Sequence, residues 1–268
     1  MPNGHTAPGL SEAGRIRYAP LAHANPGSVG DLMRILGVGA HPDDLEVHAG
    51  GTLARYARDG HEVFMAVCTD GAAGHLRIPP EHLAEIRKRE FTQAAEAIGA
   101  QPYWMGEPDG FLFENADTRL KMIEIVRWAN PDIIITHYPD DYHPDHRAAS
   151  RIVFGASFMA TTPTRLGKHP ACDTVPALFY MDTTTGLGFD PEVFVDVTDT
   201  FETKMRMVEC HASQVTWLRE HDGMDLLDFV NDMAQMRGQQ VGVAFAECFT
   251  LARLWPRVHA QELLPCSR

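Results

Sequence analysis

The chain has 268 residues, of which 44% are hydrophobic and 22% charged, and this is the composition of an ordinary globular protein. Its formal net charge of −13 repels phosphate groups, so we expect neither a nucleic acid nor an anionic membrane as a partner. No apolar run approaches the ~20 residues that a membrane-spanning helix needs. Five scattered cysteines without a C-x-x-C pattern favour reduced thiols, and we therefore expect a cytoplasmic protein.

Residues 1–30 are rich in Gly, Pro, Ala and Ser, and we predict an extended arm there, followed by one domain over residues 31–268. Within that domain, short apolar runs alternate with helical stretches. The expected strands span residues 34–40, 62–68, 101–105, 132–136, 177–182 and 193–197. The expected helices span residues 50–59, 81–98, 120–129, 145–159, 198–211 and 223–237.

This alternation predicts an α/β fold: a single Rossmann-like domain whose sheet is doubly wound, mostly parallel and flanked by helices. The β-branched strand 132–136 is expected to be buried on both faces. In such sheets the ligand lies at the carboxyl ends of the strands, where the strand order reverses. A dinucleotide is disfavoured, because Gly37 and Gly39 lack the third glycine of the phosphate-binding loop and His41 stands in its place.

Two polar clusters come directly after predicted strands. The sequence HPDD occupies residues 41–44, and DDYHPDH occupies residues 140–146. If the two strands are neighbours, these loops converge at one edge of the sheet. Imidazole and carboxylate groups suit Zn²⁺ or another divalent first-row metal, and a catalytic site needs three of them with one position open for water.

Each cluster also has a simpler interpretation. Asp43 and Asp44 are residue types that cap the N-terminus of a helix, and HPDH over 143–146 is compatible with an ordinary turn. Either explanation is adequate for one loop alone. Two such loops at the ends of strands favour a metal site over both.

Together the two motifs resemble the PIG-L/LmbE-like zinc N-deacetylases, and the resemblance extends over roughly residues 34–254. It implies that zinc is held by His41, Asp44 and His146. It also implies that Asp43 is the general base that takes a proton from the attacking water. His143 would stabilise the oxyanion or protonate the leaving amine, and Asp145 would orient a histidine. Further similar segments are TDGAAG at 69–74, Arg87-x-x-Glu90, His211-x-Ser213-Gln214 and Ala246-Glu247-x-Phe249.

Four residues are candidates for contact with the substrate: Arg87, Asp109, His75 and Tyr142. Three of them have structural alternatives. Arg87 is spaced to pair with Glu90 on one helix, Asp109 lies in a Pro-Asp-Gly turn, and His75 is as compatible with the surface as with a pocket.

The expected activity is hydrolysis of an N-acyl group, such as acetyl, from an amino sugar conjugate. One alternative is a metal-dependent hydratase or lyase acting on a small unsaturated carboxylate, and another is a sugar-binding homologue without catalysis. The family resemblance also implies a homo-oligomer, a trimer or a hexamer, whose only other partner is the small-molecule substrate.

Overall fold

The computed structural model describes residues 17–18, 32–163, 167–255 and 257. The predicted arm over residues 1–30 therefore lies outside the described residues, apart from a two-residue strand. The strands are β1 Arg17–Tyr18, β2 Arg34–Gly39, β3 Glu62–Thr69, β4 Gln101–Glu107, β5 Ile133–Thr136, β6 Thr174–Val175, β7 Ala177–Met181, β8 Val193–Asp196 and β9 Ala246–Leu251. The helices are α1 Asp44–Arg58, α2 Pro80–Glu96, α3 Ala116–Ala129, α4 Pro144–Met159, α5 Phe201–Glu209, α6 Ala212–Trp217 and α7 Leu226–Val241, with the shorter η2 Thr198–Thr200 and η3 Leu218–Asp222.

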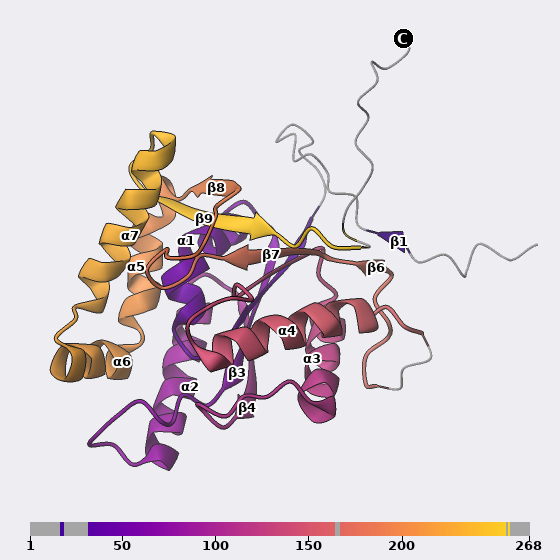
Figure 1. Ribbon diagram of the computed structural model, residues 1–268, viewed down its shortest axis with the longest axis horizontal. Helices are drawn as coiled ribbons and strands as arrows, with labels where there is room; N and C mark the ends of the chain where they lie inside the picture. The colour runs from indigo at the N-terminus through magenta and orange to yellow at the C-terminus, as the bar shows by residue number, and fades with distance from the viewer. Residues whose placement is uncertain (1–16, 19–31, 164–166, 256, 258–268) are drawn as a thin grey trace, which may run out of the picture.

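The main sheet has seven strands in the order β4-β3-β2-β5-β7-β9-β8 (Figure 1). The pairs from β4 to β7 are parallel, and β9 is antiparallel to both of its neighbours. The chain proceeds from β2 outward to β4 and then returns to the other side of β2 as β5. The strand order thus reverses between β2 and β5, which confirms the predicted doubly wound, mostly parallel α/β fold.

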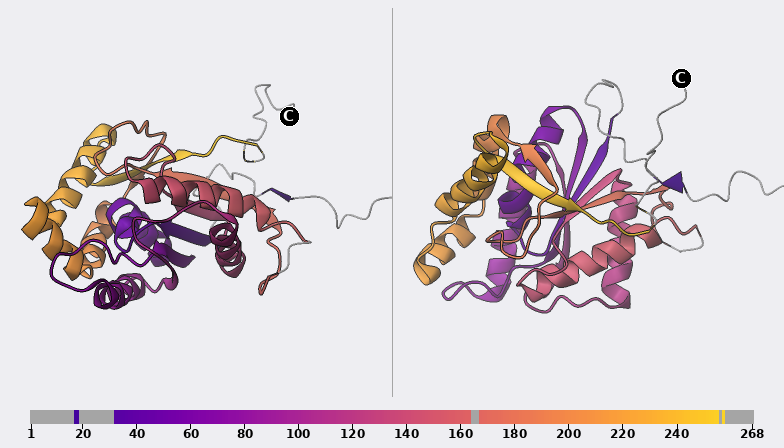
Figure 2. Two further views of the ribbon diagram at one scale, coloured as in Figure 1. Left: turned by 60° about the horizontal axis from the view of Figure 1, so that its bottom comes forward. Right: turned by 45° about the horizontal axis from the view of Figure 1, so that its top comes forward.

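Helices cover both faces of the sheet (Figure 2). On one face, Leu36 and Ile134 pack with residues of α3 and α4 in one hydrophobic cluster. On the other face, Ile35 and Ile135 pack with residues of α1, α2 and α5 in a second cluster. Alternate residues of a strand point to opposite faces, so a central strand that serves both clusters has to be apolar throughout.

The first helix begins earlier than predicted, at Asp44 rather than at residue 50. The two glycines in its middle, Gly50 and Gly51, weaken the helical signal in the sequence. Packing explains Gly51: a Cβ atom on it would lie 2.7 Å from Cβ of Val197. Close approach of Val197 therefore selects glycine at a position where the helix itself does not favour it.

The C-terminal part of the chain forms a layer beside α1. Helices α5 and α7 contact each other, and α7 packs on β9 (Figure 1). Strand β9 and the short helix α6 were not predicted as elements. Helix α5 falls within the predicted stretch 198–211, whereas α7 continues beyond the predicted end at residue 237 to Val241. Among the described residues no helix combines the length and apolar character required to cross a membrane. The four described cysteines are free thiols.

Candidate metal and active site

The two polar loops converge because β2 and β5 are hydrogen-bonded neighbours. Nδ1 of His41 lies 3.5 Å from one carboxylate oxygen of Asp44, and Nε2 of His146 lies 3.4 Å from the other. The rings of His41 and His146 have centroids 5.2 Å apart. The structure thus brings together the three residues that were predicted as metal ligands.

These separations suit a divalent metal ion. Ligand atoms around a tetrahedral zinc ion with bonds of about 2.0–2.1 Å lie about 3.3 Å apart, close to the two distances to Asp44. Three groups in the described chain bring possible ligand atoms within 4.8 Å of one another: His41, His143 and His146; Asp44, His137 and His146; and His41, Asp109 and Asp145. The predicted set combines members of the first two groups, and its role as the ligand set stays a prediction.

In both His41 and His146, a carboxylate contacts the ring nitrogen that faces away from Asp44. Nε2 of His41 lies 3.1 Å from Asp145 and 3.2 Å from Asp109, while Nδ1 of His146 lies 3.1 Å from Asp141. Asp145 also accepts the backbone N–H groups of Gly110 and Leu112, so its own position is fixed. Such partners orient the imidazoles of metal sites and set their tautomers. Asp145 therefore contacts a histidine, as the resemblance implied.

The backbone of Asp43 is strained. Its φ of 116° lies in the left-handed region, which residues other than glycine rarely adopt. The side chain makes no capping hydrogen bond to α1, although Asp43 occupies the N-cap position, so the capping interpretation is wrong for this residue. Burial and the neighbouring Asp44 carboxylate raise the pKa of Asp43 to about 7. A strained, buried carboxylate with a raised pKa is typical of a functional group.

His143 caps helix α4, and this contact defines its tautomer. Its Nδ1 accepts the backbone N–H of Asp145 at 3.2 Å, so in the neutral ring the proton resides on Nε2. Burial, reinforced by His41 and His146, lowers the pKa of His143. The residue is therefore a neutral imidazole with one N–H available to donate.

A cavity of about 230 Å³ opens beside these groups. It is lined by Asp43, His143 and the predicted ligands, and also by three of the proposed substrate contacts, Arg87, Asp109 and Tyr142. His75 is not among the lining residues. Its Nδ1 accepts the backbone N–H groups of Arg77 and Ile78, which fixes a turn instead.

The comparisons with known proteins agree with this geometry. The family PIG-L, described as GlcNAc-PI de-N-acetylase, matches residues 36–157, which include both polar loops. The segment that carries both polar loops is thus similar to the PIG-L family. A curated relative is 1D-myo-inositol 2-acetamido-2-deoxy-alpha-D-glucopyranoside deacetylase 2 of Saccharopolyspora erythraea, which is 33% identical over 176 residues. That match covers 54% of this chain and 63% of the relative, so the chain spans under two thirds of that enzyme.

Solved structures of similar fold include enzymes of two kinds. N,N'-diacetylchitobiose deacetylase from Pyrococcus horikoshii superposes with a TM-score of 0.71 at 25% identity, over 82% of this chain and 84% of that one. The 4-carboxy-2-hydroxymuconate hydratase of Pseudomonas putida superposes with a TM-score of 0.73 at 22% identity, over 85% and 99% of the two chains. The second likeness shows the fold alone, so the reaction of this protein has to be argued from its site.

The weaker sequence motifs of this chain contact one another. The expected pair of Arg87 with Glu90 does not form among the described contacts. Instead, the Arg87 guanidinium donates to the side chain of Gln214, and Glu90 accepts both the backbone N–H and the hydroxyl of Ser213. The late segment around Ser213 therefore holds helix α2 in place, with Arg87 directed to the cavity.

His48 is a cavity residue that the sequence reasoning missed. It lies four residues after Asp44 on α1, a spacing that places both side chains on one face of the helix and that was the available signal. Burial lowers the pKa of His48 to about 3, so its ring is neutral.

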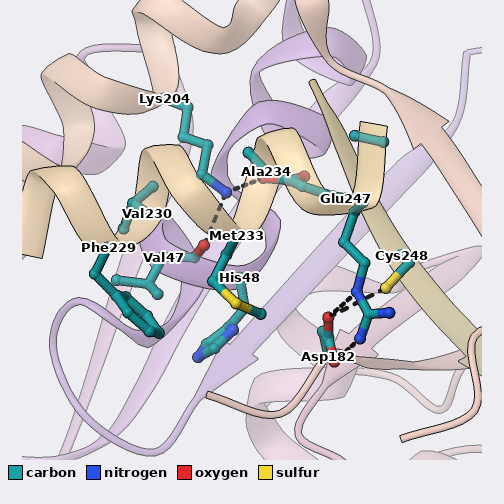
Figure 3. Close-up of a pocket in the computed structure, with 12 residues that line it drawn as sticks. Val47, His48, Asp182, Lys204, Phe229, Val230, Met233, Ala234, Glu247 and Cys248 are labelled. Atoms are coloured by element: carbon teal, nitrogen blue, oxygen red, sulfur yellow. Dashed lines mark hydrogen bonds and ion pairs between the residues drawn. The ribbon is translucent and has the colours of Figure 1, made fainter. Parts of the chain in front are cut away.

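A smaller cavity of about 30 Å³ adjoins the first, and Val47, His48 and Phe229 line both (Figure 3). Around it lies a buried ion pair in which Lys204 donates to Glu247 at 2.5 Å. Asp182 also accepts hydrogen bonds there, from Arg237 and from the thiol of Cys248. Its size suits one or two water molecules, so we assign it no substrate.

Proposed function

We propose that this protein is a metal-dependent hydrolase that removes an N-acetyl group from an amino sugar, such as an N-acetylglucosaminyl conjugate. The observation that carries the proposal is Asp43, a buried carboxylate on a strained backbone that faces a cavity beside the predicted metal ligands. The names of the Saccharopolyspora and Pyrococcus relatives, both deacetylases, support an amide as the bond that is cleaved.

The proposed metal is zinc, held by His41, Asp44 and His146. Their spacing and their buried carboxylate partners fit such an ion, and Fe²⁺, Co²⁺ or Ni²⁺ are chemically compatible alternatives. When bound, the metal supplies Lewis acidity, which lowers the pKa of water to about 7 and polarises an amide carbonyl.

The protein's own groups carry the proton transfers. Asp43 accepts a proton from the attacking water while the water oxygen bonds to the acyl carbon. Its raised pKa then allows it to deliver that proton to the nitrogen as the C–N bond breaks. The Nε2–H of His143 donates a hydrogen bond to the oxygen of the former carbonyl, where negative charge develops. The products are acetate and the free amine.

Polar groups on one side of the cavity suit a sugar. Arg87 is buried and lines the cavity, Asp109 lines it next to His41, and Tyr142 lines it as an exposed residue. We propose that these three residues bind sugar hydroxyls, which both accept and donate hydrogen bonds. A cytoplasmic, homo-oligomeric enzyme remains part of the proposal, and cell fractionation and size-exclusion chromatography test those two points.

The test is acetate release from N-acetylglucosamine conjugates by protein of measured metal content. We expect release that stops with a chelator and returns with zinc. Asp43→Asn should keep the bound metal and lower kcat by a factor of about 10² or more, because the general base is removed. Asp199→Asn is the matched control, since its carboxylate is 88% exposed and Asp199 is not among the residues that line the cavity.

The possible results separate the reactions. Full activity in Asp43→Asn would contradict the assignment of the base. Wild-type protein that holds its metal but releases no acetate, and instead hydrates unsaturated carboxylates, would replace the deacetylase proposal by the hydratase. Binding of sugars without any turnover would indicate the non-catalytic alternative.

A further inference from the structure

One side of the active-site cavity is apolar. Val47, Leu218, Met224, Leu226 and Phe229 line it, and we refer to these five residues as the apolar wall. The same cavity contains Asp43 and the predicted metal ligands, so the apolar wall faces the reacting bond and not a separate site. The hydroxyls of a sugar gain nothing from such a surface, and an N-acetyl sugar offers it only its ring C–H groups and one methyl group.

The apolar wall rests on a hydrophobic cluster of its own. Leu226 is 3% exposed and packs with Val208 and Val230, and three other members of the wall, Val47, Leu218 and Phe229, lie against that cluster. The support is a third cluster beside the two that cover the faces of the sheet. The wall is therefore a packed surface, with its shape set by the fold.

A π-helical turn positions two members of the wall. The turn η3 spans Leu218–Asp222 and ends at Gly223. The φ of Gly223 is 65°, which lies in the left-handed region that favours glycine. The backbone N–H of Met224 then donates to the carbonyl of Leu218 at 3.1 Å, which closes the loop and brings these two residues together. Single π-helical turns are frequent at functional sites.

One member of the apolar wall lies close to Asp43 and the predicted metal ligands. Val47 lies one helical turn after Asp43 and Asp44 on α1, so an apolar group against it has to be attached near the amide. The remaining members come from residues 218–229, outside the region 36–157 that matches the PIG-L family. This part of the pocket is therefore a property of this chain that the family match does not describe.

We propose that the substrate carries an apolar group next to the amide and that this group packs against the apolar wall. The inference rests on the proposed deacylase function and specifies its substrate. The apolar group has two possible sources, an acyl chain longer than acetyl or an apolar aglycone on the sugar. Either gains about fourfold in kcat/KM for each methylene that becomes buried.

Two substrate series distinguish these sources. The first is glucosamine acylated with acetyl, propionyl, butyryl or hexanoyl groups, and the second is the methyl, butyl, hexyl and phenyl glycosides of N-acetylglucosamine. We expect kcat/KM for amine release to rise along one series. In Phe229→Ala that rise should shrink about tenfold, mainly through KM, while the smallest substrate changes less than about twofold.

Two further variants keep the test decisive. Met224→Gln keeps the volume of the wall but makes it polar, and it should flatten the same series if Phe229→Ala does not fold. Met236→Ala is the matched control, because Met236 lies on α7 with 37% exposure and lines neither cavity. It should leave both series unchanged.

A rise along the acyl series identifies a longer acyl chain, and a rise along the glycoside series identifies an aglycone. Two flat series with normal acetate release overturn this inference and leave the deacetylase proposal standing. If no compound releases amine, calorimetric binding of the hexanoyl and hexyl compounds decides. Binding that is about tenfold weaker in Phe229→Ala than in the wild type supports the proposed role of the apolar wall. Equal binding by the two proteins overturns it.

Discussion

The buried ion pair between Lys204 and Glu247 allows a quantitative prediction. Both side chains are at most 3% exposed. Glu247 accepts three hydrogen bonds, from the backbone N–H groups of Gly51 and Thr52 and from the Lys204 ammonium. Lys204 also donates to the carbonyl of Val47 at 2.8 Å. The pair therefore holds the middle of α1, whose first residue is Asp44, one of the predicted metal ligands.

The change Glu247→Gln removes the negative charge and keeps the shape. It leaves the Lys204 ammonium buried without a counter-charge, and it turns an amide NH₂ toward groups that also donate. Loss of one partner of a buried pair costs about 3–5 kcal/mol. For a chain of this size, 1 kcal/mol shifts the melting temperature by about 2–4 °C, so we expect a fall of about 6–20 °C.

Urea denaturation of the metal-loaded protein measures this loss. The matched control is Glu202→Gln, because Glu202 is 89% exposed and its ion pair with Arg206 should contribute less than about 1 kcal/mol. Adding Lys204→Met to the Glu247→Gln variant should lower the free energy of unfolding by less than Lys204→Met does alone. The reason is that the double variant leaves no unpaired buried charge. A Glu247→Gln midpoint equal to that of the control would refute the reasoning.

Two further predictions concern the surroundings of α1. Gly51→Ala should destabilise the protein by about 1–3 kcal/mol because its Cβ would meet Val197, and adding Val197→Ala should restore part of the urea midpoint. Burial disfavours the charged form of His211, but Glu46 at 3.2 Å raises its pKa above the ordinary value. The stability due to His211 is thus full below about pH 6.5 and is lost as the pH rises through the raised pKa. The difference in urea midpoint between wild type and His211→Gln should shrink from about pH 5 to about pH 9, and a constant difference would contradict this.

The parallel sheet and the convergence of its two loops were predictable because their signals are local. The runs around Ile35 and Ile134 are too short and too apolar for anything but buried strands, and each polar loop follows its strand directly. One condition was not local: β2 and β5 had to be neighbours. The structure confirms it, and the contact between Asp44 and His146 follows from it.

Features that depend on packing between distant segments could not be predicted from the sequence. The predicted start of α1 was wrong because Gly50 and Gly51 weaken the helical signal in the sequence. These glycines are required by the close packing of Val197 and Lys204, which lie far along the chain. The apolar wall was missed as well, because a run such as the one around Leu226 reads equally well as the core of a helix pair. The roles of the site residues themselves stay predictions.

Four polar residues late in the chain, His211, Ser213, Gln214 and Glu247, explain why a pocket at the end of the sheet needs the C-terminal layer. Each of them contacts a polar group on α1 or α2, the two helices that carry Asp44 and Arg87. The contacts are His211 with Glu46, Ser213 with Glu90, Gln214 with Arg87, and Glu247 with Gly51 and Thr52. Because four of the five residues of the apolar wall, Leu218, Met224, Leu226 and Phe229, come after Gln214 in the chain, the same part of the chain contacts α1 and α2 and lines the pocket. A substitution that loosens this layer should therefore alter catalysis and substrate choice together.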